Sequence, residues 1–176
     1  MNSAIKLCLS VLLVVSTFAV MAQEESEWKD LSSLKGYQRM SLSVDFSDAI
    51  VDYMSVDEFK SGEQDWEEGV RDMQRRMTGT FNALVFNKAN SLRLVTQGDA
   101  SVTMTVKVLR LTSAHVSKTI TSMLAVVIIS DKQGNELFRK SMYVENGYFG
   151  SRMNLFGDVF EQLGSDFGKK CVKFIR

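Results

Sequence analysis

The chain has 176 residues, of which 45% are hydrophobic and 24% are charged. This composition is typical of a globular protein and argues against intrinsic disorder. The 21 basic and 21 acidic side chains give a formal net charge of zero, so the basic excess expected of a nucleic-acid-binding protein is absent.

The first 22 residues have the pattern of a secretory signal peptide. Lys6 precedes an apolar run from Leu7 to Val20, and cleavage is predicted after Ala22. The run is shorter than the roughly 20 apolar residues of a membrane span, and acidic rather than basic residues follow it. An uncleaved anchor is the alternative. We therefore expect a periplasmic or secreted protein with no transmembrane helix after cleavage, beginning with a flexible N-terminal leader at 23–38.

Two cysteines occur in the chain, and one of them lies in the predicted signal peptide. Removal of Cys8 leaves Cys171 without a partner for an intramolecular disulfide. We interpret Cys171 as a small buried residue on a helix, and a reactive or intermolecular thiol is the alternative. The sequence contains no Asn-x-Ser/Thr sequon, which favours a bacterial envelope over a eukaryotic secretory route.

The first half of the domain predicts one strand and one long helix. Hydrophobic and polar residues alternate from Met40 to Phe46, as in a half-buried strand. A long connection follows, and Ser61 and Gln64 then have the spacing of a capping box. A helix to about residues 87–90 is predicted by one apolar stripe: Trp66, Val70, Met73, Met77, Phe81 and Leu84.

The second half predicts four strands and a final helix. The strands are expected at Leu92–Thr96, Val102–Val108, Met123–Ile129 and Leu137–Val144. The apolar face of the last helix consists of Phe156, Val159, Phe160, Leu163, Phe167, Cys171 and Phe174. The order β-α-β-β-β-β-α predicts a single α+β domain at 39–176. We expect a two-layer sandwich with a mostly antiparallel sheet of four to five strands and two long helices on one face.

Residue types that support catalysis are sparse. His115 is the single histidine, which excludes multi-histidine metal sites, and we interpret it as a surface residue. Asp45, Asp48, Asp52 and Asp57 form the one carboxylate cluster. We interpret this cluster as a solvated loop, with a Ca²⁺ site or a catalytic pair at Asp45 and Asp48 as the alternatives. We predict no enzymatic activity, no cofactor and no metal site.

Two loops carry candidate partner-binding residues. Tyr53 and Met54 lie in the long first connection, and Tyr148 and Phe149 lie between two glycines. Aromatic residues are enriched at interface hot spots, so these four residues are predicted to contact a partner. The alternative for Tyr148 and Phe149 is that they cap the end of the core. An exposed edge strand is a second route to a partner or to a second copy of the chain.

Two motifs resemble those of small bacterial envelope proteins. The segment GDASVTMTV at residues 98–106 resembles the strand after the first helix of YajG-like and ABC-transporter auxiliary lipoproteins, whose fold is related to CsgG and the N-terminal domain of TolB. The turn DKQGNEL at residues 131–137 is similar to their Asp-x-x-Gly hairpin. The chain lacks the lipobox cysteine of the lipoprotein members. The resemblance implies a periplasmic, non-catalytic accessory domain, and it carries over no functional residue.

These observations converge on one functional prediction. We expect an exported, non-enzymatic binding or adaptor domain of the bacterial cell envelope that contacts a larger envelope or transport assembly or a second copy of itself. Peripheral contact with a membrane or lipid is compatible with this role. The alternative is a carrier of a lipid or small apolar ligand, held in a pocket between the helices and the sheet.

Overall fold

The computed structural model describes residues 28–86, 88 and 92–175. The chain divides into two units, Met1–Asp30 and Leu31–Arg176. The second unit contains the fold described below, apart from the first residues of a short 3-10 helix, η1 (Lys29–Leu34). The predicted signal peptide and its cleavage site lie outside the described residues. Within the described residues, no helix has the length and apolar character needed to cross a membrane.

The described residues form a sheet of seven strands around the long strand β5. The strands are β1 (Arg39–Asp45), β2 (Ile50–Val51), β3 (Met54–Ser55), β4 (Arg93–Val95), β5 (Val102–Thr112), β6 (Thr121–Asp131) and β7 (Glu136–Asn146). One edge of β5 pairs with β6, which in turn pairs with β7. The other edge pairs first with β1 and then, further along, with β2. Thus β1 and β2 lie one after the other along the same edge of β5.

The sheet is mixed rather than mostly antiparallel. The long hairpins β5–β6 and β6–β7 are antiparallel, as the sequence predicts. Strand β1, however, runs parallel to both β4 and β5. The predicted count of four to five strands was also too low, because the connection after β1 contributes β2 and β3, which are two residues long each. Segments this short carry no detectable hydrophobic period.

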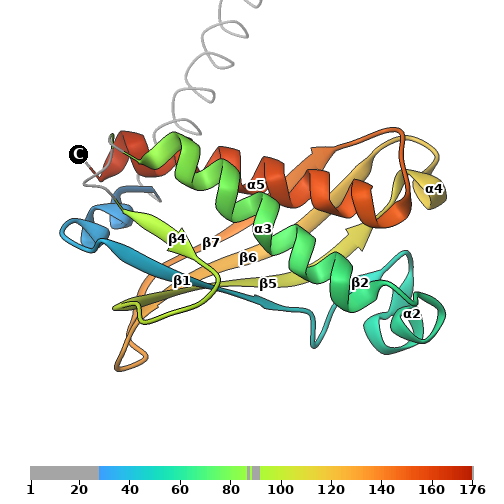
Figure 1. Ribbon diagram of the computed structural model, residues 1–176, viewed down its shortest axis with the longest axis horizontal. Helices are drawn as coiled ribbons and strands as arrows, with labels where there is room; N and C mark the ends of the chain where they lie inside the picture. Colours follow the sequence, from blue (N-terminus) through green and yellow to red (C-terminus); the bar gives the residue numbers. More distant parts are fainter. Residues whose placement is uncertain (1–27, 87, 89–91, 176) are drawn as a thin grey trace, which may run out of the picture. The chain divides into compact units, whose positions relative to one another are not determined.

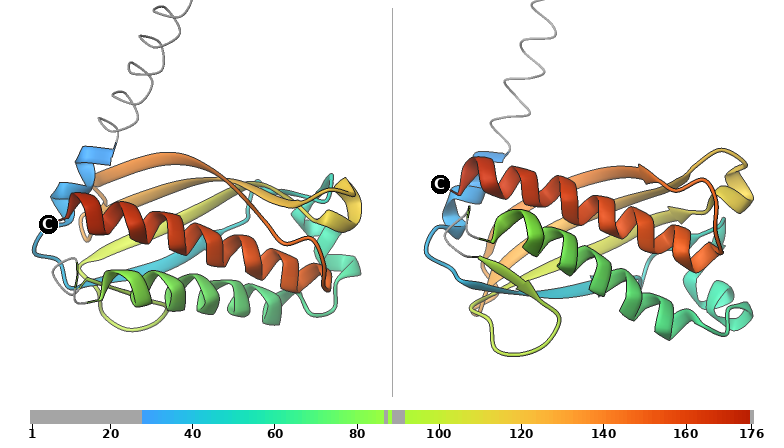
Figure 2. Two further views of the ribbon diagram at one scale, coloured as in Figure 1. Left: turned by 90° about the horizontal axis from the view of Figure 1, so that it is seen from above. Right: turned by 45° about the horizontal axis from the view of Figure 1, so that its top comes forward.

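Two long helices cover one face of this sheet, as predicted (Figure 1). These are α3 (Trp66–Val85) and α5 (Arg152–Phe174), and the two shorter helices are α2 (Val56–Gly62) and α4 (Ala114–Ser117). The long elements follow the predicted order β-α-β-β-β-β-α, and Figure 2 shows both long helices on the same side of the strands. The class α+β is therefore confirmed, whereas the short helices were not predicted.

The predicted capping box at Ser61 is wrong, because the residues before α3 form a helix of their own. Ser61 lies inside α2, where its Oγ donates to the Glu58 carbonyl at 2.7 Å. Helix α2 is instead capped by Ser55, whose Oγ accepts from the Glu58 N–H at 3.3 Å. Helix α3 begins after Asp65, which makes no side-chain cap hydrogen bond. It ends at Val85, somewhat earlier than predicted.

Aromatic and aliphatic side chains fill the space between the two layers. The Phe81 and Phe167 rings are stacked with centroids 6.2 Å apart, and Phe138 meets Phe167 edge-on at 5.7 Å. Cys171 is completely buried among these layers, which confirms its interpretation as a buried residue. Alternate strand residues complete this core: Met104, Val106, Val108, Met123, Ala125, Val127 and Ile129.

Part of the segment predicted to be a flexible leader, 23–38, forms the 3-10 helix η1 (Lys29–Leu34). Leu31 and Leu34 of η1 are completely buried, and both belong to the second compact unit, Leu31–Arg176. Two leucines three residues apart in a polar segment are too few to establish a helical period. The rest of the predicted leader, up to residue 27, lies outside the described residues.

Candidate partner-binding site

Three segments that are far apart in the sequence meet at one end of the sheet. They are the β2–β3 turn, helix α4 and the loop between β7 and α5, all at the right of Figure 1. Hydrogen bonds and an ion pair join them through Asp52, Ser113 and Arg152, here called the Asp52 network. We call this region the α4 end.

Asp52 is the centre of this network because its completely buried side chain contacts both Ser113 and Arg152. Its Oδ1 accepts from the Ser113 backbone N–H at 2.6 Å, and its Oδ2 accepts from the Ser113 hydroxyl at 2.8 Å. The Arg152 Nε lies 3.0 Å from Oδ2, but its N–H is not aligned for a hydrogen bond, so this contact is an ion pair. A buried carboxylate needs such partners, since an unpaired one is strongly unfavourable. The β2–β3 turn is thereby fixed to α4 and α5.

Arg152 has further contacts on the same side of the molecule. Its Nη1 lies 3.8 Å from the Glu63 Oε2, and its guanidinium lies 5.5 Å from the centre of the Phe59 ring. These contacts connect the start of α5 to α2. The side chain remains 37% exposed, so solvent screens these interactions.

The β2–β3 turn has a backbone conformation that suits one of its residues better than the other. Both central residues have positive φ, +47° at Asp52 and +67° at Tyr53, as in the type I′ turns that join antiparallel strands. Aspartate tolerates this left-handed region, whereas a bulky residue does so at a cost of about 1 kcal/mol or more. The turn leaves the Tyr53 side chain 68% exposed.

The loop before α5 presents two more aromatic side chains. Gly147 has φ +75° and Gly150 has φ +140°, which glycine adopts readily and other residues do not. Tyr148 and Phe149 lie between these glycines and are 62% and 94% exposed. The alternative that they cap the end of the core is therefore wrong. The Gly150 carbonyl O lies 2.8 Å from His115 Nε2 and connects this loop to α4.

The four predicted partner-binding residues thus lie at the same end of the sheet, three of them in loops and Met54 in β3. Tyr53, Tyr148 and Phe149 are exposed, and we call them the aromatic triplet. Met54 differs, because it is half-buried in β3, where it pairs with Val51. His115 is exposed, which confirms its interpretation as a surface residue. Partner binding by these residues stays a prediction.

The carboxylates of the predicted cluster do not converge. Asp45 accepts from the Ser47 N–H at 2.8 Å, and this backbone hydrogen bond together with the Ser47 side chain lowers the pKa of Asp45. Asp48 lies 2.6 Å from the Lys107 Nζ, and Asp52 belongs to its own network. Among the described residues, no group of three or more histidine, cysteine or acidic side chains is arranged to hold a metal ion.

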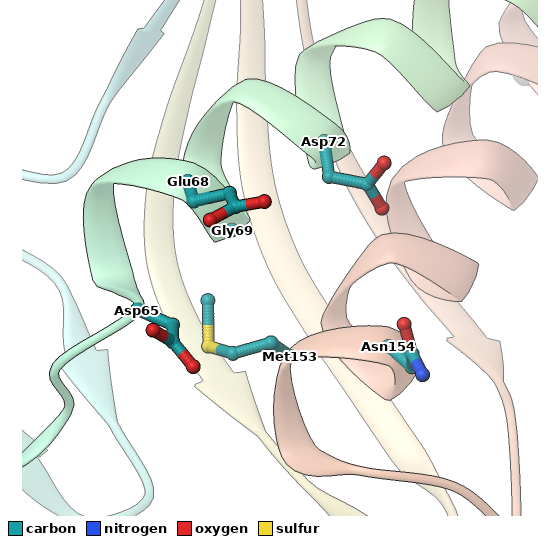
Figure 3. Close-up of a pocket in the computed structure, with 6 residues that line it drawn as sticks. All are labelled: Asp65, Glu68, Gly69, Asp72, Met153 and Asn154. Atoms are coloured by element: carbon teal, nitrogen blue, oxygen red, sulfur yellow. The ribbon is translucent and has the colours of Figure 1, made fainter.

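A polar pocket, which the sequence did not indicate, lies between the starts of α3 and α5. Figure 3 shows its lining residues, Asp65, Glu68, Gly69, Asp72, Met153 and Asn154, around a volume of about 260 Å³. The Met153 side chain packs directly over Gly69, where a Cβ would lie 1.9 Å from the Met153 Cε. The pocket therefore owes its shape to the absence of a side chain at this glycine.

Arg76 offsets the negative charge at one side of this pocket. It forms ion pairs with Asp72 at 2.6 Å and with Asp158 at 2.9 Å, and it donates to the Asn154 Oδ1 at 3.2 Å. Burial raises the pKa of Asp72, but hydrogen bonds from Arg75 and Arg76 outweigh it, so the net pKa is below its usual value. The contacts of Arg76 with Asp158 and Asn154 connect α3 to α5, so this group of charged side chains has a structural role.

Comparisons with known proteins do not assign the chain to a family. No family model and no curated protein matches it. Among solved structures, it resembles the PelC dodecamer from Paraburkholderia phytofirmans with a TM-score of 0.40 and 8% identity, covering 73% of this chain and 86% of that one. The Xanthomonas campestris protein XCC0632 (DUF330) gives a TM-score of 0.40 and 7% identity, covering 78% and 85%.

A third structure is that of an uncharacterized protein, with a TM-score of 0.36 and 10% identity. The match covers 57% of this chain and 61% of that one, so the chain spans less than two thirds of that protein's length. The resemblance to YajG-like and ABC-transporter auxiliary lipoproteins, to CsgG and to TolB is not confirmed by these comparisons and stays a prediction.

Proposed function

We propose that this protein is an exported, non-enzymatic binding or adaptor domain of the bacterial cell envelope, and that it contacts a larger envelope or transport assembly through the aromatic triplet. The observation that carries the proposal is the exposure of Tyr53, Tyr148 and Phe149 on loops at one end. Large aromatic side chains bury extensive surface on binding and dominate many interfaces.

The support beneath these loops favours a preformed binding surface. The Asp52 network fixes the turn that carries Tyr53. The contact between His115 and Gly150 fixes the loop that carries Tyr148 and Phe149. Side chains on loops that are already ordered lose less conformational entropy on binding, which leaves more of the contact energy as affinity.

A non-catalytic role is consistent with the environment of the titratable groups. Catalysis generally requires a base and a nucleophile or acid held within hydrogen-bond reach of each other. His115 contacts a backbone carbonyl, while Asp48 pairs with Lys107 and Asp52 with Arg152. These contacts suit structural roles for the three side chains.

Photo-crosslinking in living cells tests the proposed surface. A photoreactive amino acid at Tyr148 or Phe149 is expected to trap a discrete partner. The matched control carries it at Gln133, which is exposed in the turn between β6 and β7, away from α4 in Figure 1. The same adducts from Gln133 as from Tyr148, or diffuse adducts from all positions, would contradict the proposal.

The alternative of a lipid or ligand carrier has less support. The interlayer space where such a ligand would bind contains the contacting rings of Phe81, Phe138 and Phe167. Native mass spectrometry of protein purified from its own host is expected to give the bare protein mass. Co-purified lipid would favour the carrier instead.

A further inference from the structure

Strand β7 forms a long edge of the sheet. Over the part of the chain that the structure describes, β7 pairs with β6 and with no other strand. It has 11 residues, which is long for an edge strand, and it forms the border of the sheet next to α5 in Figure 2. The outward main-chain groups of an edge strand can pair with another strand.

The side chains of β7 alternate between the two faces of the sheet. Phe138 and Val144 are buried on the helix-covered face. Arg139, Ser141, Tyr143 and Glu145 have the opposite parity and are exposed. Directly opposed residues of an antiparallel pair share a face. If two copies of β7 pair around a twofold axis, the register must therefore be centred on a residue and not between two residues.

We propose that β7 pairs antiparallel with β7 of a second copy, in the register centred on Met142. Arg139 then lies opposite Glu145 of the second copy, and Glu145 opposite Arg139 of the second copy, which gives two oppositely charged pairs on the exposed face. Opposite charges at directly opposed positions stabilise strand pairing, and like charges destabilise it. The two Met142 side chains oppose each other on the other face.

Neighbouring registers lack this complementarity. A centre at Ser141 places Arg139 opposite Tyr143 and Glu145 opposite Leu137, and a centre at Tyr143 places Glu145 opposite Ser141. The register centred on Met142 also stays within residues 139–145. This register does not involve the Leu137 carbonyl, which already accepts from the Ser33 hydroxyl at 3.5 Å.

Exposed apolar surface adds to the charge argument. Tyr143 is 62% exposed, and Leu124, which lies opposite it on β6, is 36% exposed. In the proposed register the Tyr143 side chains of the two copies are diagonal neighbours, within reach of each other for aromatic residues. In the single chain the Tyr143 hydroxyl donates to Glu145 at 2.5 Å, and Arg139 pairs with Glu136. Pairing of two copies thus brings a second carboxylate to each Arg139.

Charge reversal tests the register directly. Sedimentation equilibrium of the purified protein at low salt is expected to show a monomer–dimer equilibrium. Arg139→Glu and Glu145→Arg should each weaken it at least about tenfold, because each places two like-charged pairs in the interface. The double variant should restore dimerisation, since the charges are exchanged. Lys132→Glu is the control, because Lys132 pairs with Asp99 in a different part of the sheet, and it should change nothing.

Cysteine crosslinking provides an independent measurement. In a Cys8→Ser background, Met142→Cys should form a disulfide-linked dimer on mild oxidation, because position 142 opposes itself. Lys140→Cys should not, because position 140 opposes position 144 of the second copy. A monomeric wild type at high concentration, a double charge variant as weak as the single ones, or equal crosslinking at 140 and 142 would each overturn the proposal.

Discussion

Asp52 controls how the α4 end is held together. Its buried carboxylate contacts Ser113 on the segment before α4 and Arg152 at the start of α5, so one side chain connects three parts of the chain. Both Ser113 and Asp52 are buried. Their hydrogen bonds therefore cannot be replaced by water without local opening.

Replacing Asp52 is expected to destabilise the protein. Asp52→Ala leaves the Ser113 N–H buried without its acceptor and Arg152 without its closest carboxylate, at a cost of about 2–3 kcal/mol. Asp52→Asn should cost less, because the amide keeps an acceptor and tolerates positive φ. Urea unfolding followed by circular dichroism measures both variants. Equal stabilities for Asp52→Ala and the wild type would contradict the role of the network.

Substitution of Tyr53 is expected to affect the stability of the protein and its binding to a partner differently. Tyr53→Gly removes an unfavourable left-handed conformation and gives the turn the Asp-Gly pair that type I′ turns prefer, so stability should stay level or rise by up to about 1 kcal/mol. The same variant should weaken partner capture from a crosslinker at Tyr148. Thermal unfolding and crosslinking yield measure the two effects. Capture unchanged by the substitution would remove Tyr53 from the binding surface.

The contact between α3 and α5 depends on a close approach at Gly164. A Cβ at this position would lie 2.5 Å from the Met77 carbonyl oxygen, and backbone cannot move aside as a flexible side chain can. Gly164→Ala is therefore expected to destabilise the protein by about 1–3 kcal/mol. Chemical denaturation measures the change.

Gly79 in α3 is the matched control for this substitution. It is exposed, and a Cβ there would meet nothing within 4 Å. Gly79→Ala should stabilise the protein by up to about 1 kcal/mol, because alanine has the higher helix propensity. Changes of the same sign at both positions would show that propensity rather than helix contact determines the result.

The elements that the sequence predicts well are those in which the hydrophobic pattern continues over many residues. The stripe from Trp66 to Phe81 lies in α3, and the apolar run from Met123 to Ile129 lies within β6. The sequence predicts no element in the connection after β1, because a two-residue strand and a seven-residue helix are shorter than the windows in which a period is detectable. The parallel pairing of β1 with β5 was equally hidden, since strand alternation does not reveal direction.

The candidate site likewise contains residues that the sequence predicts and residues that it does not. Tyr148 and Phe149 were found because glycines on both sides mark a loop. The pairing of Asp52 with Arg152 was not found, because 100 positions separate the two residues and no local motif connects them. The conformation of Tyr53 was also hidden, since tyrosine is not a residue that signals a left-handed turn.

The molecule as a whole is expected to lose stability in acid. The pKa of Asp72 is lowered because hydrogen bonds from Arg75 and Arg76 outweigh the effect of burial. The Asn135 side chain and the backbone N–H groups of the β6–β7 turn lower the pKa of Asp131, although desolvation opposes them. A carboxyl with a lowered folded pKa contributes stability above its unfolded pKa, and this contribution is lost as the pH falls through the folded value.

Melting temperatures measured from pH 7 to pH 3 should therefore be level above about pH 5 and fall below about pH 4. Asp72→Asn should reduce the steepness of this fall, because the variant has one fewer carboxyl whose pKa differs between the folded and unfolded states. An Asp72→Asn profile parallel to that of the wild type throughout this range would contradict the assignment.

The reactivity of the buried Cys171 thiol can report on the undocking of α5 from the rest of the protein. Burial raises the pKa of this thiol far above its ordinary value, so alkylating reagents should not react with it while α5 is docked. In a Cys8→Ser background, the labelling rate in mild denaturant should follow the population of open molecules. Gly164→Ala should accelerate labelling and Gly79→Ala should slow it, so a single sulfur atom would record how firmly the last helix is held, without any attached dye.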